Sequence, residues 1–277
     1  MKNPRTLKEA LKGKLSEKEL SFIPSSFDVI GDIGIFADYP KELEKKEKLI
    51  ADSLMSLHNN IRTVLKKTKK YSGKFRLPKL KIISGKRTKE AEYKENNIRL
   101  KLNVEKVYFS PRLGNERKRV SQIVKENESV LVMFSGCGIY PLVISKNAKP
   151  KEVYAIEMNP VAHKYAEENI KLNKITNIRL FLGDVNKVLP KIKKKFDRIL
   201  MPLPKGAEDF LDIALSNIKK KGIIHFYDFL KEDEFGKAVE KIDAACKKRK
   251  KKCKILNIVK CGQFGPRIYR VCVDFRV

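Results

Sequence analysis

The feature that most constrains the fold is a buried strand that turns through glycine into a helix. Residues 129–138 read SVLVMFSGCG, so an apolar run enters a turn that holds Gly136 and Gly138, and a helical pattern follows over residues 139–147. Doubly wound α/β domains hold a nucleotide-like cofactor at such a turn. Many strand–helix turns carry Gly-x-Gly for packing alone, so the surrounding chain has to separate the two interpretations.

The C-terminal half alternates strands with helices, which predicts a doubly wound sheet. We expect strands at residues 130–134, 152–156, 178–182, 198–201 and 222–226, and helices at 139–147, 160–172, 205–217 and 232–246. Strands 254–259 and 267–275 follow one another without a helix, which predicts an antiparallel hairpin at the edge. The expected fold class is α/β: a Rossmann-like sheet of the class I methyltransferase kind, mostly parallel with an antiparallel C-terminal edge strand, preceded by a small α+β domain.

The N-terminal half has a different rhythm. Residues 1–24 are expected to form a basic lead-in that is partly helical, with leucines at 7, 11, 15 and 20. Residues 25–105 are expected to form a small α+β domain that binds RNA or substrate, with bends at Gly31 and Gly34, a helix after Pro40 and a basic loop at 66–74. Residues 106–277 are expected to form the methyltransferase domain.

The charge of the chain points to a polyanionic partner. Lys and Arg number 62 against 33 Asp and Glu, so the formal net charge is +29. Such a field attracts nucleic acid first. The densest lysine runs are 193–195, 219–221 and 247–252. Lysine enrichment is also typical of hot habitats, and each run is also compatible with a solvated loop.

Cysteine and hydropathy patterns exclude several classes of protein. Five cysteines form no CxxC pair and there are only three histidines, so no metal site is expected. An odd cysteine count without an apolar signal core predicts reduced thiols in the cytoplasm. No apolar run reaches the ~18 residues of a membrane helix.

Acidic residues close two of the predicted strands. Glu157 lies about 20 positions after the glycine turn, where a carboxylate accepts from ribose hydroxyls. Asp184 ends the next strand and is placed to accept from an adenine amino group, although a turn or helix-capping Asp fits as well. No phosphate cradle is evident, so S-adenosylmethionine fits better than NAD. Pro202 and Pro204 follow the fourth strand and fix the backbone where a flat base would enter.

Several stretches together carry a family resemblance. They are FDVIGDIGI (27–35), GKFRLPKL (73–80), YFSPRLGNERKRV (108–120), MFSGCGIYPL (133–142), YAIEMNPVA (154–162), ENIKLNK (168–174) and MPLPKGAEDFLDIAL (201–215). In these the chain resembles the archaeal and eukaryotic tRNA (guanine-37 N1)-methyltransferases over residues ~25–277. The resemblance implies a monomer that binds the anticodon stem-loop of tRNA.

The resemblance also implies roles for individual residues. Arg76 resembles the arginine that contacts guanine O6, and Glu116 the carboxylate that takes the N1 proton; a surface arginine and a first-turn helix carboxylate are the plainer alternatives. Methylation of N1, whose pKa is ~9, needs a base, and a cation at O6 would stabilise the developing charge. The expected cofactor contacts are Tyr108, Phe134, Gly136, Gly138, Glu157, Asp184 and Pro202, and the expected RNA contacts are Arg112, Pro204 and Lys205.

The chain departs from the family pattern in three places. Pro202 stands where the family usually has Asn before Leu-Pro, and Val132 where it usually has Asp. The separate N-terminal domain that grips the tRNA elbow is missing or reduced to residues 1–22. These departures affect base recognition, cofactor affinity and tRNA checking, in that order.

Four functions remain open at the level of sequence. The first is methyl transfer to guanine N1. The second is the related wybutosine-pathway aminocarboxypropyl transfer, in a relative that also lacks Asn-Leu-Pro but usually diverges at the FSPRL…ER segment. The third is methylation of a tricyclic guanosine derivative, and the fourth is RNA binding without catalysis.

Overall fold

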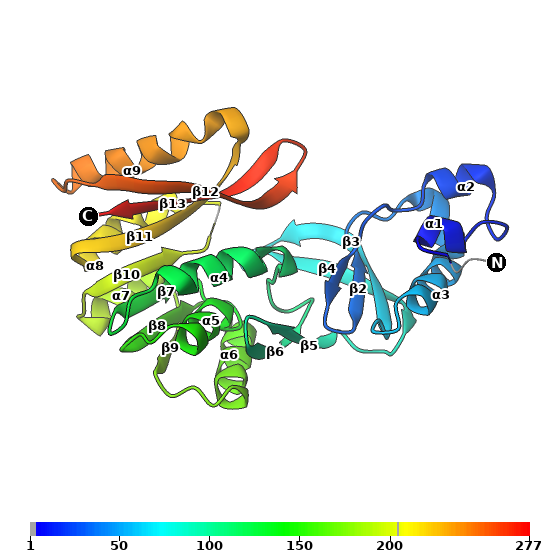
Figure 1. Ribbon diagram of the computed structural model, residues 1–277, viewed down its shortest axis with the longest axis horizontal. Helices are drawn as coiled ribbons and strands as arrows, with labels where there is room; N and C mark the ends of the chain where they lie inside the picture. Colours follow the sequence, from blue (N-terminus) through cyan, green and yellow to red (C-terminus); the bar gives the residue numbers. More distant parts are fainter. Residues whose placement is uncertain (1–3, 204) are drawn as a thin grey trace. The chain divides into compact units, whose positions relative to one another are not determined.

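The structure, a computed structural model, describes residues 4–203 and 205–277. The chain folds into two compact units. The first unit comprises residues 1–94 and 100–111, and the second comprises residues 95–99 and 112–277. Figure 1 shows the elements in chain order by colour. Among the described residues, no helix combines the length and the apolar character needed to cross a membrane.

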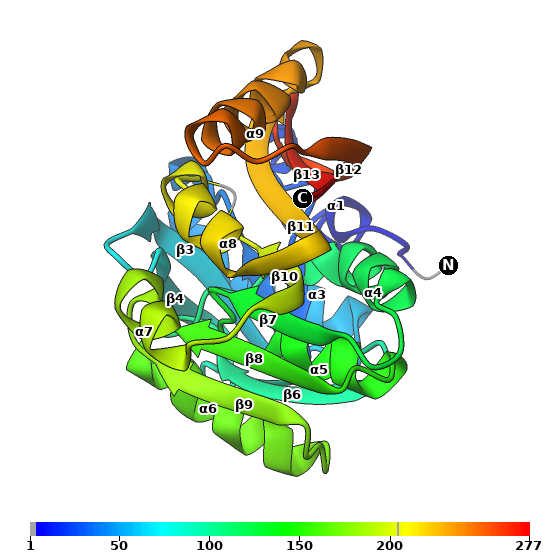
Figure 2. The same cartoon turned by 90° about the vertical axis from the view of Figure 1, so that its left-hand side faces the viewer.

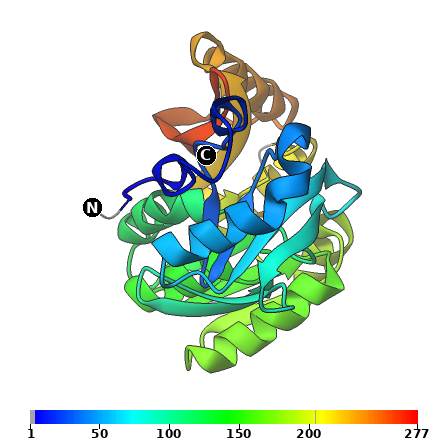
Figure 3. The same ribbon diagram turned by 90° about the vertical axis from the view of Figure 1, so that its right-hand side faces the viewer.

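The first unit is built on a four-stranded sheet in the order β1-β2-β3-β4. Its strands are β1 Asp28–Ile30, β2 Ile33–Phe36, β3 Thr63–Ser72 and β4 Leu77–Gly85, and its helices are α1 Leu7–Ala10, α2 Glu17–Ser21, the 3-10 helix η1 Lys41–Lys46 and α3 Glu47–Leu57. Strands β2 and β3 are parallel because η1 and α3 form the crossover between them. Helix α3 packs on β3 and β4 of this sheet (Figure 3).

The leucines of the predicted lead-in belong to the core of this unit. Leu11 and Leu20 are 0% and 2% exposed. They share one apolar cluster with residues of α3 and the sheet; its buried members are Leu7, Leu11, Leu15, Leu20, Phe36, Leu43, Ile50, Ala51, Leu54, Ile61 and Val64. Residues 7–20 are therefore a packed part of the first unit rather than a separate basic arm.

Two local predictions in this half need correction. Residues 66–72 continue β3 instead of forming a loop, because Lys69 pairs with Lys79 and Ser72 with Leu77 of β4. Cross-strand pairing here overrides a lysine-rich sequence that is unfavourable for strands. Gly31 does make a turn, with φ +61°, and a Cβ there would lie 2.2 Å from the carbonyl oxygen of Glu92. Gly34 lies inside β2 and is not a bend.

The second unit contains a seven-stranded sheet in the order β12-β13-β11-β10-β7-β8-β9 (Figure 2). The strands are β7 Ser129–Met133, β8 Glu152–Glu157, β9 Ile178–Leu182, β10 Phe196–Met201, β11 Ile218–Lys231, β12 Lys254–Gly265 and β13 Ile268–Arg276. The predicted antiparallel C-terminal strand is confirmed in β13, which pairs antiparallel with β11. It belongs to the predicted antiparallel hairpin at the edge of the sheet, in which β12 is the outermost strand and β13 lies next to β11.

Helices cover both faces of this sheet. They are α4 Gly114–Ile123, α5 Ile139–Asn147, α6 Pro160–Leu172, α7 Val185–Ile192, α8 Leu211–Asn217 and α9 Gly236–Lys248, with the 3-10 turns η2 Pro111–Leu113, η3 Glu208–Phe210 and η4 Glu232–Glu234. The core on one face joins residues of α7, α8 and α9 to the sheet. The predicted bounds of α5, α6 and β9 are confirmed, whereas α7 was not predicted.

A hairpin of β5 Glu90–Glu95 and β6 Ile98–Asn103 has its tip, residues 95–99, in the second unit. The carboxylate of Glu95 pairs with Arg117 of α4, which is 1% exposed. Asn96 donates to the carbonyl of Gly114 at 3.0 Å. These contacts fix the start of α4, which carries a predicted catalytic residue.

Truncating Leu11 tests whether the N-terminal helices are part of the core. Leu11→Ala should lower the free energy of unfolding of the first unit by about 2–5 kcal/mol, because a fully buried leucine leaves a cavity. The matched control is Lys12→Ala, at an exposed neighbouring position. Urea unfolding of both variants measures the difference; equal stability would show that residues 7–20 contribute nothing to the core.

Candidate active site

The glycine turn after β7 has an unusual backbone. Phe134, Gly136 and Gly138 have φ of +59°, +57° and +86°. A left-handed phenylalanine costs of order 1–3 kcal/mol, and such strain collects at functional sites. Phe134 is held by Phe210, with ring centroids 4.8 Å apart. Gly138 caps α5, and a Cβ there would lie 3.2 Å from Cβ of Ala166 in α6.

Glu157 closes this turn from the end of β8. Its Oε2 accepts from the backbone N–H of Gly136 at 2.7 Å, and its Oε1 accepts from the N–H of Asn159 at 2.7 Å. Burial raises the pKa of Glu157 despite these bonds. A carboxylate offers about four lone-pair sites, so the side chain retains acceptors for a ribose diol.

Asp184 lies after β9 and Pro202 lies after β10, two strands that β7 and β8 separate in the sheet. Asp184 is the N-cap of α7, and its Oδ1 accepts from the N–H of Asn186 at 2.8 Å. The capping interpretation therefore holds, and it uses one of the two carboxylate oxygens. Pro202 is the centre of a tight turn in which the N–H of Leu203 donates to the carbonyl of Met201 at 2.7 Å. Pro204, a predicted RNA contact, lies outside the described residues.

The turn fits a nucleoside-type cofactor on its own features. The hydroxyl of Ser135 is buried and has no hydrogen-bond partner among residues 4–203 and 205–277. Two carboxylates, Glu157 and Asp184, supply acceptors for hydroxyl and amino groups. Val132 is fully buried beside Ala155 and Leu200, so the sheet provides no carboxylate at that position.

Glu116, on α4, is buried in a polar network. Arg119 donates to both of its oxygens, from Nε to Oε2 at 2.7 Å and from Nη2 to Oε1 at 2.8 Å. The hydroxyl of Tyr227 on β11 donates to Oε1 at 2.7 Å. Tyr227 in turn lies 3.4 Å, oxygen to oxygen, from Tyr140 of α5. Burial raises the pKa of both tyrosines, so they stay neutral.

The same arginine connects Glu116 to a second set of buried groups. Arg119 Nη1 donates to Oδ2 of Asp274 at 2.6 Å, and His225 Nδ1 lies 2.5 Å from Oδ1 of Asp274. Arg198 Nη1 lies 2.8 Å from Nε2 of His225 and also pairs with Glu128. Burial lowers the pKa of His225. We therefore assign a neutral ring that donates from Nδ1 to Asp274 and accepts at Nε2.

Burial alone would raise the pKa of Asp274, but the His225 and Arg119 contacts hold that pKa well below its usual range. His225, Cys272 and Asp274 also form a group of possible metal ligands among the described residues. Arg119 and Arg198 contact this group from two sides. Two fixed cations next to the site oppose a metal dication, so we interpret the group as a hydrogen-bond network.

The remaining predicted site residues are divided between the units. Arg76 lies in the first unit, in the β3–β4 turn with φ +51°, and Tyr108 lies in the same unit after β6. Arg112 and Lys205 lie in the second unit and are exposed. The structure brings Phe134, Gly136, Gly138 and Glu157 together at one turn.

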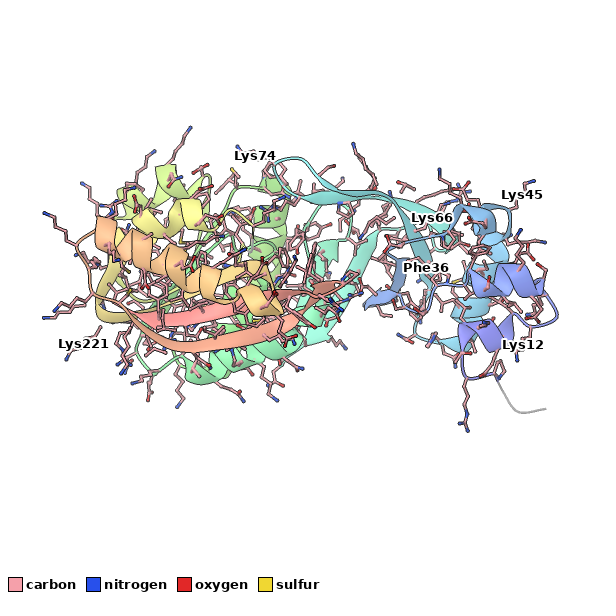
Figure 4. The ribbon with its side chains drawn as sticks, turned by 90° about the horizontal axis from the view of Figure 1, so that it is seen from above. Lys12, Phe36, Lys45, Lys66, Lys74 and Lys221 are labelled. Atoms are coloured by element: carbon pink, nitrogen blue, oxygen red, sulfur yellow. The ribbon has the colours of Figure 1, made fainter. Side chains whose placement is uncertain are left out.

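The lysine runs lie at the opposite end of the sheet from that turn. Residues 193–195 follow α7 and residues 219–221 follow α8, while residues 247–252 include the last two residues of α9 and the segment after it. All three runs precede or begin strands, whereas the glycine turn follows the carboxyl end of β7. Cations are favoured at helix C-termini. Several already pair with carboxylates, as in Lys194–Glu152 and Lys219–Asp197. Figure 4 shows lysine side chains around both units, including Lys74 of the first and Lys221 of the second.

Sequence reasoning missed the network partners of Glu116. No motif marks Arg119, Tyr227, His225 or Asp274, although His225 and Asp274 are polar residues within the largely apolar stretches IIHFYDF and VCVDFRV. A polar residue inside a buried apolar strand needs a partner. This was the signal available in the sequence.

Comparison with known proteins agrees with this geometry. Residues 91–256 match the family model described as the TRM5/TYW2 methyltransferase domain, and residues 7–88 match the TYW2 N-terminal domain. The chain is 42% identical over 257 residues to the tRNA (guanine(37)-N(1))-methyltransferase Trm5b of Pyrococcus abyssi, covering 92% of this chain and 76% of the relative.

Two further relatives bear on substrate and partner. The tRNA (guanine(37)-N(1))/4-demethylwyosine(37)-methyltransferase Taw22 of Nanoarchaeum equitans is 35% identical over 302 residues, covering 90% of this chain and 98% of the relative. The solved complex of aTrm5 and tRNALeu has a TM-score of 0.86 at 32% identity, covering 100% of this chain and 79% of that chain.

Replacing Asp274 tests the buried network. Asp274→Asn should lower the free energy of unfolding at neutral pH by about 3–5 kcal/mol, because it removes a buried carboxylate and leaves the partly buried Arg119 with one anionic partner fewer. The depressed pKa of Asp274 contributes stability that is present above its unfolded pKa of about 3.9 and is lost as pH falls towards the folded value.

Urea unfolding at pH 7 and at pH 3 measures both effects. The wild type should lose more stability than Asp274→Asn between these pH values. Asp233→Asn, an exposed position, is the control. If both variants behave alike at both pH values, Asp274 has no special role in stability.

Proposed function

The chain belongs to the TRM5/TYW2 methyltransferase family, and from this premise we propose that it transfers the methyl group of S-adenosylmethionine to N1 of guanosine 37 in tRNA. Family membership and the class I sheet leave three candidate reactions: methyl transfer to guanine N1, methylation of a tricyclic guanosine derivative, and aminocarboxypropyl transfer. The relative named Trm5b, at 42% identity, favours guanine N1 within that set.

One observation carries the proposal. The carboxylate of Glu116 is joined through Tyr227 to Tyr140, which lies two residues after Gly138. The predicted proton acceptor is thus joined by hydrogen bonds to helix α5, which begins directly after the predicted cofactor turn. The motif that contains Glu116, FSPRL…ER, is also the segment at which the aminocarboxypropyl relative usually diverges.

The cofactor would be held by residues of the glycine turn and by two strand ends. Glu157 would accept from the ribose hydroxyls, Asp184 from the adenine amino group, and the turn at Gly136 and Gly138 would let the backbone approach closely. When bound, the cofactor supplies an electrophilic methyl group on a sulfonium. Without an acidic residue at Val132, more of the binding falls to Glu157 and Asp184.

Glu116 would accept the proton that leaves guanine N1 as the new N–C bond forms. Its described bonds, two from Arg119 and one from Tyr227, leave room for a further donor. Arg119 also binds Asp274, so its charge is shared between two carboxylates. Arg76 would stabilise the negative charge that develops at O6.

The likeness to Taw22 supports a second candidate. That relative's name includes methylation of 4-demethylwyosine, and the match covers 98% of its length. Pro202 replaces the usual base-contacting Asn, which removes one polar contact to guanine and suits a larger apolar tricyclic base. Aminocarboxypropyl transfer, the TYW2 reaction, and binding without catalysis are the remaining alternatives.

The partner we propose is the anticodon stem-loop of tRNA, bound by a monomer in the cytoplasm. The solved complex of aTrm5 with tRNALeu, which aligns over the whole chain, supports tRNA as the partner class. The net charge of +29 favours any polyanion, so specificity has to come from contacts at the site.

A double-label assay tests the proposed reaction. Transcribed tRNA with guanosine at position 37 is incubated with cofactor labelled either on the methyl group or on the aminobutyrate portion. We expect methyl label only. Aminobutyrate label would establish the TYW2 reaction, and methyl label only on tRNA carrying 4-demethylwyosine would establish the second candidate. Binding without either label would overturn catalysis.

Replacing Glu116 tests the proposed base. Glu116→Gln should lower the single-turnover rate by about 10²–10⁴-fold, the range of general base catalysis, with cofactor Kd nearly unchanged. Tyr227→Phe is the matched control, because it removes a hydrogen bond to Glu116 but leaves the carboxylate. An unchanged rate in Glu116→Gln would exclude Glu116 as the base.

A further inference from the structure

An exposed phenylalanine lies at the end of the β12–β13 hairpin. Phe264 is 56% exposed, more than any other large apolar side chain of the described residues. Gln263 pairs with Tyr269 and Gly265 with Ile268, so Phe264 is the extra residue of a β-bulge. Bulges re-aim a side chain and are frequent beside active sites.

The bulge places the ring of Phe264 against the ring of Phe229. Its centroid lies 4.1 Å from that of Phe229 on β11, with 31° between the ring planes. The guanidinium carbon of Arg270 on β13 lies 5.0 Å from the Phe229 centroid. In the sheet, Arg270 lies opposite Phe229 of β11 on one side and opposite Gly262 of β12 on the other. Phe264 thus has one face covered by a ring and retains substantial exposed surface.

Phe229 lies on the same face of the sheet as Tyr227, which contacts Glu116. Tyr227 and Phe229 are two residues apart on β11, so they point to the same side of the sheet at a spacing of about 6.6 Å. Tyr227 donates to Glu116. Cys272 and Arg270 form the matching pairs on β13. The Phe229–Phe264 pair therefore lies one step beyond the Glu116 contact, towards the carboxyl end of β11.

The surroundings of Phe264 are cationic. Arg267 in the hairpin turn and Lys231 at the end of β11 are exposed. A Cβ on Gly262 would lie 3.9 Å from the carbonyl oxygen of Arg112, so the edge strand approaches the predicted RNA-contacting segment. An exposed aromatic ring with a cationic rim is the arrangement with which proteins stack single-stranded bases and hold their phosphates.

We propose that Phe264 is a stacking platform for a tRNA base that flanks the modified nucleotide. The inference rests on the proposed function, because it takes the guanosine at Glu116 as the target. Unpaired loop bases offer a flat face of the required kind, and the cations Arg267 and Lys231 match the charge of their phosphates.

The absence of tryptophan from the sequence allows a direct test. Phe264→Trp introduces a unique fluorophore at the platform, and Ile258→Trp introduces one on the same strand, at a 40% exposed position, as the matched control. On titration with an anticodon stem-loop, quenching of the introduced indole is the stacking signal. We expect strong quenching for Phe264→Trp and little for Ile258→Trp, and an abasic substitution next to the target should abolish it.

Steady-state kinetics supply the second readout. Phe264→Ala should raise KM for tRNA by about 5–100-fold with little change in cofactor Kd, and Phe264→Tyr should restore the KM. A change in cofactor Kd or in folding alone would indicate a structural role of the ring and overturn the platform. Methyl transfer by the wild type, with unquenched fluorescence and unchanged KM in the variants, would also overturn it. Quenching without methyl transfer would support the platform and reject the proposed function.

Discussion

The second unit depends on one shared cation, the guanidinium of Arg119. It binds Glu116 within its own helix and Asp274 on the last strand, 155 residues away in sequence. A buried carboxylate without such a partner is strongly destabilising. Arg119 therefore allows Glu116 to be both charged and covered, and it ties α4 to the sheet. His225 and Arg198 extend the same arrangement, so the position of the proposed base is set by the C-terminal strands.

The main helices and strands around the glycine turn of the second unit could be predicted from the sequence alone. The glycine turn, α5, α6 and β9 follow from clear periodicity and from strand-end signals that are local. Glu157 could be placed because its distance from the turn is fixed by one strand–helix unit. Helix α7 was missed because Pro190 lies inside it; burial of Val185 and Leu189 holds the helix all the same. The lysine-rich end of β3 was missed because its pairing with β4 is a tertiary property.

The partners of Glu116 could not be predicted in the same way. Arg119, Tyr227 and Asp274 meet only after three separate segments have folded into adjacent elements, and no spacing along the chain encodes that meeting. The net charge of the chain does not indicate where RNA would bind. Net charge is a property of the whole chain, whereas binding depends on location, and three lysine runs lie at the end of the sheet remote from the turn. Their pairing with carboxylates and their places after helix ends explain much of this enrichment without RNA.

The two faces of strands β11 and β13 show how the sheet separates stability from chemistry. Phe226, Val271, Val273 and Phe275 point to one face and belong to the apolar core with α9. Tyr227, Arg270, Cys272 and Asp274 alternate with them and point to the face of α4. Because successive side chains alternate between faces, a one-residue slip would bury the polar set in the apolar core. The register of the C-terminal hairpin is therefore constrained by the apolar face, and that constraint in turn fixes the positions of Cys272 and Asp274, which contact Arg119 from β13.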